Sequence, residues 1–388
     1  MTADLDRTIA HLADLIAFPS VSRDSNLPIL DHIRGILINL GARIEFLPSP
    51  CGTKANLFAT LGPNRPGGVV LSGHSDVVPV DDQEWSSDPF ALWPDDGRLY
   101  GRGTCDMKGF IAACLTVAEG LDVHALERPI HICLTHDEEV GCIGARALLP
   151  QLARLGYRPS MAIVGEPTEM QVVDGHKGCC EYVTRFHGLA GHGSQPDQGV
   201  NAVAYAARYA GRLLDLVEGL KARRPSDSPF DPPWSTINIG LLNGGVGLNV
   251  IPSTAELGWE MRPVQQSDLA YVKDQLATFQ ATELLPAMTA ISRDAGIMTE
   301  VIGEVRELTP EAVNPARDLA MYLTGANAAQ TVPFNTEAGL FQTEGIPSVL
   351  CGPGSIAQAH KADEFIAIDQ LAKCLTFLDG VAQYCMSK

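Results

Sequence analysis

Basic side chains are scarce in this sequence of 388 residues, which has 28 Lys and Arg against 46 Asp and Glu. The formal net charge at pH 7 is therefore −18. An acidic surface repels phosphate backbones, so the composition argues against a nucleic-acid partner. The charge fits a small cationic substrate only weakly, and acidity that serves solubility alone is the better explanation.

Long apolar runs are also missing. No stretch reaches the roughly 18 apolar residues that a membrane-spanning helix requires. The first twenty residues read as an amphipathic helix and lack the basic and then apolar segments of a signal peptide. We therefore expect no membrane span and no secretion, and we predict a cytoplasmic location.

Cysteine pairs with a metal-binding spacing are absent as well. The ten cysteines are scattered, Cys179 and Cys180 are adjacent, and no C-x-x-C pair occurs. Reduced thiols in a cytosolic protein are the simplest interpretation. A thiolate metal site is the alternative.

The length of the chain predicts two domains, because single hydrophobic cores stop growing at roughly 250–300 residues. Apolar strands alternate with helical patterns at first, which is typical of an α/β domain with a mostly parallel sheet covered on both sides. A strand–helix–strand–strand–helix–strand order over 181–290 predicts an inserted, ferredoxin-like α+β domain. We assign 1–180 and 291–388 to the α/β domain.

Polar clusters follow the predicted strands of the α/β domain. These strands lie at 68–71, 130–134, 161–164 and 347–351, and a further segment precedes the helix predicted at 108–120. The carboxyl ends of strands in an open α/β sheet share one edge, where ligands bind. We therefore expect one cleft to hold the residues His74, Asp106, Glu138, Glu139, Glu166 and His360.

Such a cluster of imidazoles and carboxylates favours a pair of divalent cations. Without cations, burial and mutual repulsion would drive some carboxylates to take up protons. Imidazole and carboxylate ligands suit zinc, with cobalt or manganese as substitutes. Taken singly, Asp106 also fits a helix N-cap, His74 a core histidine and Glu166 a turn residue.

The motifs themselves resemble the M20 family of di-zinc peptidases and deacylases, over nearly the whole chain. Ser75 stands where that family commonly has threonine. The motifs are Gly73-His74-Ser75-Asp76, Gly101-x-Gly-x-x-Asp106-Met107-Lys108-Gly109, Asp137-Glu138-Glu139 and Gly165-Glu166-Pro167-Thr168.

The resemblance implies two Zn²⁺ ions per subunit, with Co²⁺ able to substitute. By that resemblance His74, Asp106 and Glu166 bind one ion. His360, Asp106 and Glu139 bind the other, so that Asp106 bridges the two.

Further roles are implied for three residues. Asp76 accepts a hydrogen bond from His74 and fixes its tautomer, and Glu138 is the general base that acts on a metal-activated water. His192, in the segment 191–196, matches an oxyanion-stabilising histidine that in relatives reaches the partner subunit's active site. This implies a homodimer whose inserted domain serves as lid and dimerisation domain. A surface histidine in a glycine-rich turn is the alternative for His192.

Within the family, the chain is most similar to the branch that hydrolyses N2-acetyl-L-ornithine to L-ornithine and acetate, in arginine biosynthesis. The segment Asn335-Thr336-Glu337-Ala338 favours this branch over succinyl-diaminopimelate desuccinylases, which typically have Thr-Ser-Asp-Gly there. A desuccinylase, an aminoacylase and a dipeptidase stay open as alternatives. A non-catalytic metal-binding protein is a different class, but it would need no spare base beside Glu139.

Three residues are candidates for substrate binding. Arg262 offers a planar fork to the α-carboxylate of the substrate, although a structural salt bridge explains it equally well. Asn249 adds a polar contact, and Glu337 is the predicted partner of the ornithine side-chain ammonium.

Overall fold

The computed structural model describes residues 2–387 and divides the chain into two compact units. The first unit contains the chain up to Gly175, Pro310–Thr331 and the chain from Thr336 onward. The second unit contains His176–Thr309 and Val332–Asn335.

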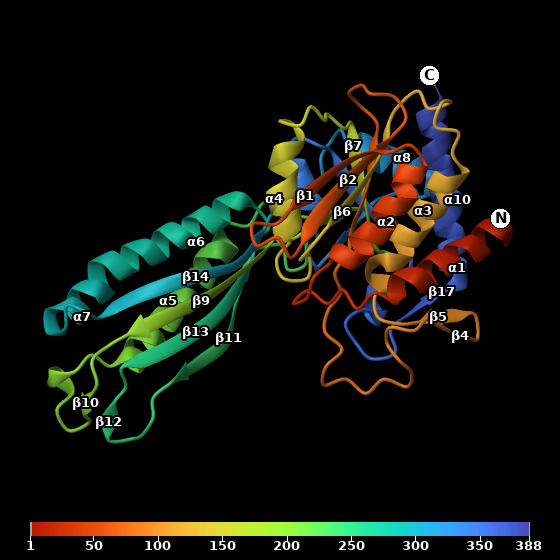
Figure 1. The fold of residues 1–388 in the computed structure, drawn as a ribbon. Coiled ribbons are helices and arrows are strands. Elements are labelled where there is room, and N and C mark those ends of the chain that lie inside the picture. The colour runs from red at the N-terminus through yellow and green to blue at the C-terminus, as the bar shows by residue number, and fades with distance from the viewer. Residues whose placement is uncertain (1, 388) are drawn as a thin grey trace. The chain divides into compact units, whose positions relative to one another are not determined.

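The first unit is built on an eight-stranded sheet (Figure 1). Its four central strands are mutually parallel and its outer pairings β1–β2, β2–β6 and β16–β8 are antiparallel, so the prediction of a mostly parallel sheet is confirmed. The strand order is β1 (Arg43–Pro48), β2 (Ala55–Leu61), β6 (Ile130–Thr135), β3 (Val69–His74), β7 (Met161–Pro167), β16 (Ser348–Gly352), β8 (Val173–His176) and β15 (Gln330–Val332).

Helices bury both faces of this sheet. Every position of β3, β6, β7 and β16 is buried, which explains why these strands are continuous apolar runs rather than alternating ones. Alternate strand residues share one core with α1, α2, α3, α8 and α10, whereas α4 and α9 contact β2, β6, β7 and β16. The helices are α1 (Thr2–Ile16), α2 (Leu27–Asn39), α3 (Gly109–Gly120), α4 (Ile143–Leu152), α8 (Pro315–Thr324), α9 (Ala338–Thr343) and α10 (Ile368–Met386).

A small three-stranded sheet lies in the same unit. It joins β17 (Phe365–Ala367), β5 (Arg98–Tyr100) and β4 (Trp93–Asp95) in that order. The pairing of β17 with β5 therefore brings the region after residue 360 beside the region that leads to Asp106.

The second unit has a four-stranded antiparallel sheet in the order β11 (Thr236–Gly244), β13 (Thr254–Arg262), β9 (Cys179–His187) and β14 (Gly296–Val305). Helices α5 (Ala202–Ala222) and α6 (Gln266–Phe279) share its hydrophobic core, and the ferredoxin-like order agrees with the prediction. The remaining elements are α7 (Leu285–Ile291) and the two-residue strands β10 (Gly191–His192) and β12 (Val250–Ile251).

The alternation of β13 explains how this core forms. Ala255, Leu257, Trp259 and Met261 are buried, and the residues between them are half-buried. The unit extends beyond the predicted end at residue 290, because β14 is hydrogen-bonded along its length to β9. Within residues 2–387, every helix is too short or too polar to span a bilayer.

Candidate active site

The carboxyl ends of the parallel strands supply most of the predicted site residues. His74 is the last residue of β3, and Glu166 is the penultimate residue of β7. Glu138 and Glu139 follow β6 in the loop before α4. Asp106 lies in the segment Thr104–Lys108, which is kinked and non-helical at Asp106 and leads directly into α3.

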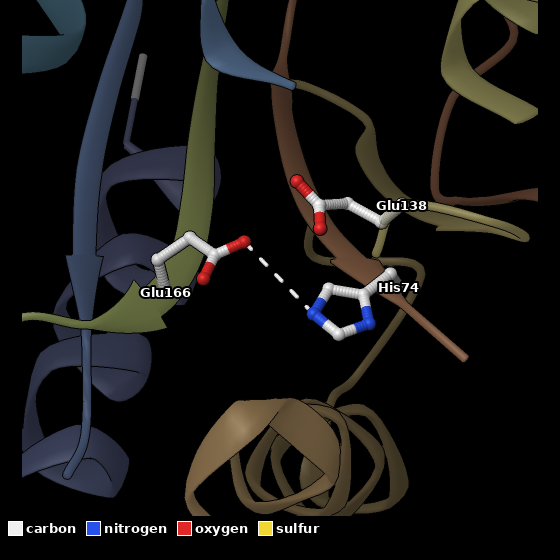
Figure 2. A group of neighbouring side chains, drawn as sticks. All are labelled: His74, Glu138 and Glu166. Carbon is white, nitrogen blue, oxygen red and sulfur yellow. Dashed lines mark ion pairs between the residues drawn. The ribbon is translucent and has the colours of Figure 1, made fainter. Parts of the chain in front are cut away.

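His74, Glu138 and Glu166 form the first group of ligand-type atoms. One atom from each lies within 4.8 Å of the others, and Figure 2 shows the three side chains converging. His74 Nε2 is 4.0 Å from Glu166 Oε1. That carboxylate oxygen is buried and accepts no hydrogen bond from the described residues, which leaves it available to a cation.

Asp106 connects the first group to a second one. Its Oδ1 lies 3.0 Å from His74 Nε2, and its Oδ2 lies 3.2 Å from His360 Nε2. His360 Nε2 is also 3.0 Å from Glu139 Oε2. The structure thus brings together all five residues predicted as metal ligands, with one Asp106 oxygen directed to each histidine.

Burial dominates the electrostatics of the carboxylates. It raises the pKa of Glu138 to about 8, and the charges of Glu139 and Asp106 add to this rise. Burial also raises the pKa of Glu139 and, more strongly, that of Glu166. Asp106 differs, because hydrogen bonds from the two histidines outweigh its burial and lower its pKa. A cation would relieve this crowding of negative charge.

The histidines respond in the opposite sense. Hydrogen bonds to Asp106 and Glu139 raise the pKa of His360 to about 11. For His74, burial opposes protonation, but the carboxylate of Asp106 still raises its pKa well above the usual value. The neighbouring carboxylates therefore favour the protonated form of each imidazole, and a bound metal ion would neutralise that negative charge instead.

Asp76 contacts its neighbours in a different way from the one we predicted. His74 Nδ1 donates to the main-chain oxygen of Asp76 at 2.8 Å, whereas the nearer carboxylate oxygen is 3.8 Å away. The Asp76 carboxylate instead accepts from the backbone N–H of Glu138 at 3.1 Å, from that of Glu139 at 3.4 Å and from Ser22 Oγ at 2.8 Å. The main chain thus orients His74, and the side chain orients the Glu138–Glu139 loop.

Glu337 is the only predicted substrate-binding residue in the first unit, and it is buried. Its two carboxylate oxygens accept from Ser72 Oγ at 2.5 Å and from Thr135 Oγ1 at 2.8 Å. Burial raises its pKa. Each oxygen thus already accepts one hydrogen bond from a hydroxyl group.

His192 and Asn249 are neighbours within the second unit. Strands β10 and β12 pair, and Gly193 N donates to Asn249 O at 2.7 Å. His192 is exposed, and its Nδ1 lies 2.7 Å from Ser194 Oγ. Sequence patterns alone do not connect the segment 191–196 with Asn249, whereas the pairing of β10 with β12 brings them together.

Arg262 already has a carboxylate partner in this structure. Its Nε and Nη2 donate to Glu260 Oε2 at 3.1 and 2.9 Å, and its Nη1 donates to Asn335 Oδ1 at 3.0 Å. Arg262 thus forms a salt bridge with Glu260, which is the alternative to substrate binding. Glu260 also forms a group of ligand-type atoms with Cys179 and Glu181, but the guanidinium of Arg262 opposes a cation there.

Sequence reasoning missed a buried ion pair beside the site. Arg102 Nη1 lies 2.7 Å from Glu364 Oε2, and each side chain is 1% exposed. Both residues stand four positions from a predicted ligand, Arg102 before Asp106 and Glu364 after His360. The charged residue Arg102 inside the motif Gly101–Gly109 was the sequence feature that could have indicated a buried ion pair.

The chain is similar to known proteins over nearly its whole length. It is 36% identical over 398 residues to the acetylornithine deacetylase of Myxococcus xanthus, with 99% of each chain covered. It is 34% identical over 385 residues to the acetylornithine deacetylase of Edwardsiella ictaluri, with 97% of each covered.

Solved structures share the fold at low sequence identity. An M20 family metallo-carboxypeptidase of Sulfolobus solfataricus aligns with a TM-score of 0.74 and 18% identity, over 98% of this chain and 99% of that one. A dinuclear metal-binding M20 peptidase of Bacillus subtilis aligns with a TM-score of 0.64 and 18% identity, over 98% of both chains. Residues 70–384 match the model of peptidase family M20/M25/M40. The chain therefore belongs to peptidase family M20/M25/M40, and it is a metal-dependent amidohydrolase.

Proposed function

We propose that this chain hydrolyses N2-acetyl-L-ornithine to L-ornithine and acetate, a step of arginine biosynthesis. The observation that carries the proposal is the identity of 34–36% to proteins named acetylornithine deacetylase, over nearly the full length of the chain. The clustered histidines and carboxylates supply the chemistry that amide hydrolysis requires.

The residues fit a pair of zinc ions. The donors are imidazole nitrogens and carboxylate oxygens, and one of them, Glu166 Oε1, is buried without a hydrogen bond. We propose His74, Asp106 and Glu166 for one Zn²⁺, and His360, Asp106 and Glu139 for the other, with Co²⁺ as a substitute. Bound there, the ions would supply Lewis acidity that acidifies a water molecule and polarises the acetyl carbonyl.

Glu138 is the proposed general base. Its carboxylate takes a proton from the attacking water and delivers that proton to the nitrogen of the leaving amine. Without cations, burial and the neighbouring carboxylates raise the pKa of Glu138 to about 8. Nearby cations would lower this pKa and keep the base ionised at neutral pH. The backbone contact to Asp76 holds the loop that presents Glu138.

His192 is the proposed donor to the oxyanion that forms as the carbonyl is attacked, in a homodimer. Exposed apolar residues of the second unit support such an association, including Leu241, Leu242, Met298 and Val301. Because nine of the ten cysteines are buried thiols, we further propose a reducing, cytoplasmic location.

Arg262 and Asn249 are proposed to contact the α-carboxylate of the substrate. For Arg262 this requires the guanidinium group to leave the carboxylate of Glu260 and bind that of the substrate. Glu337 is the proposed partner of the ornithine ammonium, and its buried carboxylate also accepts from Ser72 and Thr135.

A substrate panel tests the proposal. The metal-loaded protein should turn over N2-acetyl-L-ornithine faster than N-succinyl-diaminopimelate, other N-acyl amino acids and dipeptides, and exhaustive chelation should abolish the activity. Faster turnover of another member of the panel would replace the proposed substrate. Undiminished turnover after chelation would remove the metal-dependent mechanism.

A further inference from the structure

The carboxylate of Glu364 holds the chain segment that carries Asp106. Glu364 is 1% exposed, and its Oε1 accepts from the backbone N–H groups of Cys105 at 2.9 Å and Asp106 at 3.1 Å. Its Oε2 accepts from the backbone N–H of Gly103 at 2.9 Å. Three amide donors thus surround one carboxylate, which is a typical arrangement for fixing an anion against a loop.

Arg102 completes this arrangement and extends it toward His360. It is the largest fully buried side chain of the described residues, and its Nη1 donates to Glu364 Oε2 at 2.7 Å and to the main-chain oxygen of Lys361 at 3.3 Å. Its Nη2 donates to Gln83 Oε1 at 2.6 Å. A buried charge is costly unless it is paired and hydrogen-bonded, so these contacts depend on one another.

Gln83 reaches the main chain of His360 itself. Gln83 Nε2 donates to His360 O at 3.1 Å. The side chain of His360 is 53% exposed, whereas that of His74 is 1% exposed. The imidazole of His360 contacts Asp106 and Glu139, and the hydrogen bonds to its own main chain and to that of Lys361 hold the segment that carries it.

We propose that Glu364, Arg102 and Gln83 are positioning residues for the metal site that contains Asp106, Glu139 and His360. They join the segments of Asp106 and His360, and so they set the affinity of the second ion. The inference rests on the proposed function, because it assumes that these residues bind metal. None of the three positioning residues is itself placed as a ligand.

The substitution Glu364→Gln tests this role while preserving the shape of the side chain. One carboxylate oxygen becomes an NH₂ group that faces N–H donors, so the hold on the Asp106 segment weakens. In the full-length protein, titrated with Zn²⁺ against a chelator of known affinity, the second ion should bind about ten- to a hundredfold more weakly. The first ion should lose less affinity, because it shares Asp106 but its other proposed ligands, His74 and Glu166, lie on β3 and β7.

Asp268→Asn is the matched control. Asp268 is also a buried carboxylate held by an arginine, with Arg223 Nε at 3.0 Å and Ser235 Oγ at 2.6 Å, and these partners belong to the second unit. The substitution Asp268→Asn should lower the thermal unfolding temperature and leave both Zn²⁺ affinities unchanged. A loss of stability in Glu364→Gln with unchanged Zn²⁺ binding would assign Glu364 a purely structural role and overturn the inference.

Gln83→Met provides a second test at a half-buried position, which keeps the experiment decisive if Glu364→Gln does not fold. It removes the contact to His360 O, and we expect the second ion to bind at least about threefold more weakly. Two tightly bound ions in this variant would contradict the inference alone. A wild-type protein that binds no Zn²⁺ would instead contradict the proposed function, and the inference with it.

Discussion

At the residue scale, the candidate site is defined by an imbalance between neighbouring charges. Four carboxylates, from Asp106, Glu138, Glu139 and Glu166, converge on two histidines, and burial raises the pKa of three of the four. Buried clusters of carboxylates with shifted pKa values are typical of functional sites. The same groups would be compatible with one another around two cations.

Replacement of Glu138 by alanine should separate metal binding from proton transfer. Glu138 is not among the proposed ligands, so Glu138→Ala should retain two Zn²⁺ and lose about two to four orders of magnitude in kcat. Metal content by elemental analysis, measured together with steady-state kinetics, checks both statements. Near-normal kcat would show that Glu138 is not the base.

His131 gives a residue-scale prediction that is independent of the site. It is 2% exposed on β6, with Thr60 Oγ1 at 2.8 Å from its Nδ1, and burial lowers its pKa to about 4. Between pH 4 and about 6.5 the unfolded chain binds a proton at His131 that the folded chain does not bind. The free energy of unfolding should therefore fall as the pH drops through this window.

Urea unfolding of the metal-free protein at pH 7 and pH 5 measures this effect. In His131→Gln the loss of unfolding free energy between the two pH values should be smaller than in the wild type by about 1–2 kcal/mol. Equal losses in the two proteins would mean that His131 is protonated in the folded state at pH 5.

At the scale of elements, the strand ends and the helix behind them must fit closely for the ligands to converge. Gly165 immediately precedes Glu166 in β7, and a Cβ atom added to Gly165 would lie 2.0 Å from the ring of Phe110 in α3. The glycine therefore permits the contact between strand and helix that sets the depth of Glu166.

Gly165→Ala should lower the free energy of unfolding by about 1–3 kcal/mol, because the aromatic ring or the strand must move. It should also weaken Zn²⁺ binding through the displacement of Glu166. Gly120→Ala, at the end of the same helix, is the control, since an added Cβ meets nothing within 4 Å and the change should stay within about 1 kcal/mol. Equal stabilities of the two variants would refute this account of the packing.

At the scale of the whole molecule, the strands of the two units differ in how far their apolar side chains are buried. The central strands β3, β6, β7 and β16 of the first unit are buried along their whole length, whereas the edge strands β11 and β14 of the second unit expose apolar side chains. Leu242 is 47% exposed, and Val301 is 48% exposed. Exposed edges of this kind are sites at which a second chain can associate.

Leu242→Glu should therefore shift the proposed dimer toward monomer. A charge at an apolar interface costs desolvation energy in the associated state only. Light scattering after size-exclusion chromatography should show a lower mass for this variant at micromolar concentration. Tyr322→Glu, at an 83% exposed position of the first unit, should leave the mass unchanged. A wild type that is monomeric at all concentrations would contradict the dimer.

Local patterns were sufficient to predict much of this protein. Apolar runs predicted β3, β6, β7 and β16, because strands buried on both faces leave a continuous signature in the sequence. Since ligands gather where parallel strands end, the polar residues after those runs identified the candidate site. The motif spacing identified the family, and the order of elements predicted the ferredoxin-like arrangement of the second unit.

Tertiary structure decided what depends on contacts between distant segments. The carboxylate of Asp76 meets the backbone of Glu138 across 62 residues, and Glu364 meets Arg102 across 262 residues. Residue 290 was a poor boundary for the second unit because β14 pairs with β9, more than a hundred residues earlier in the chain. Periodicity and spacing record what one segment buries, whereas the partner of a buried charge is selected only when the folded chain brings two segments together.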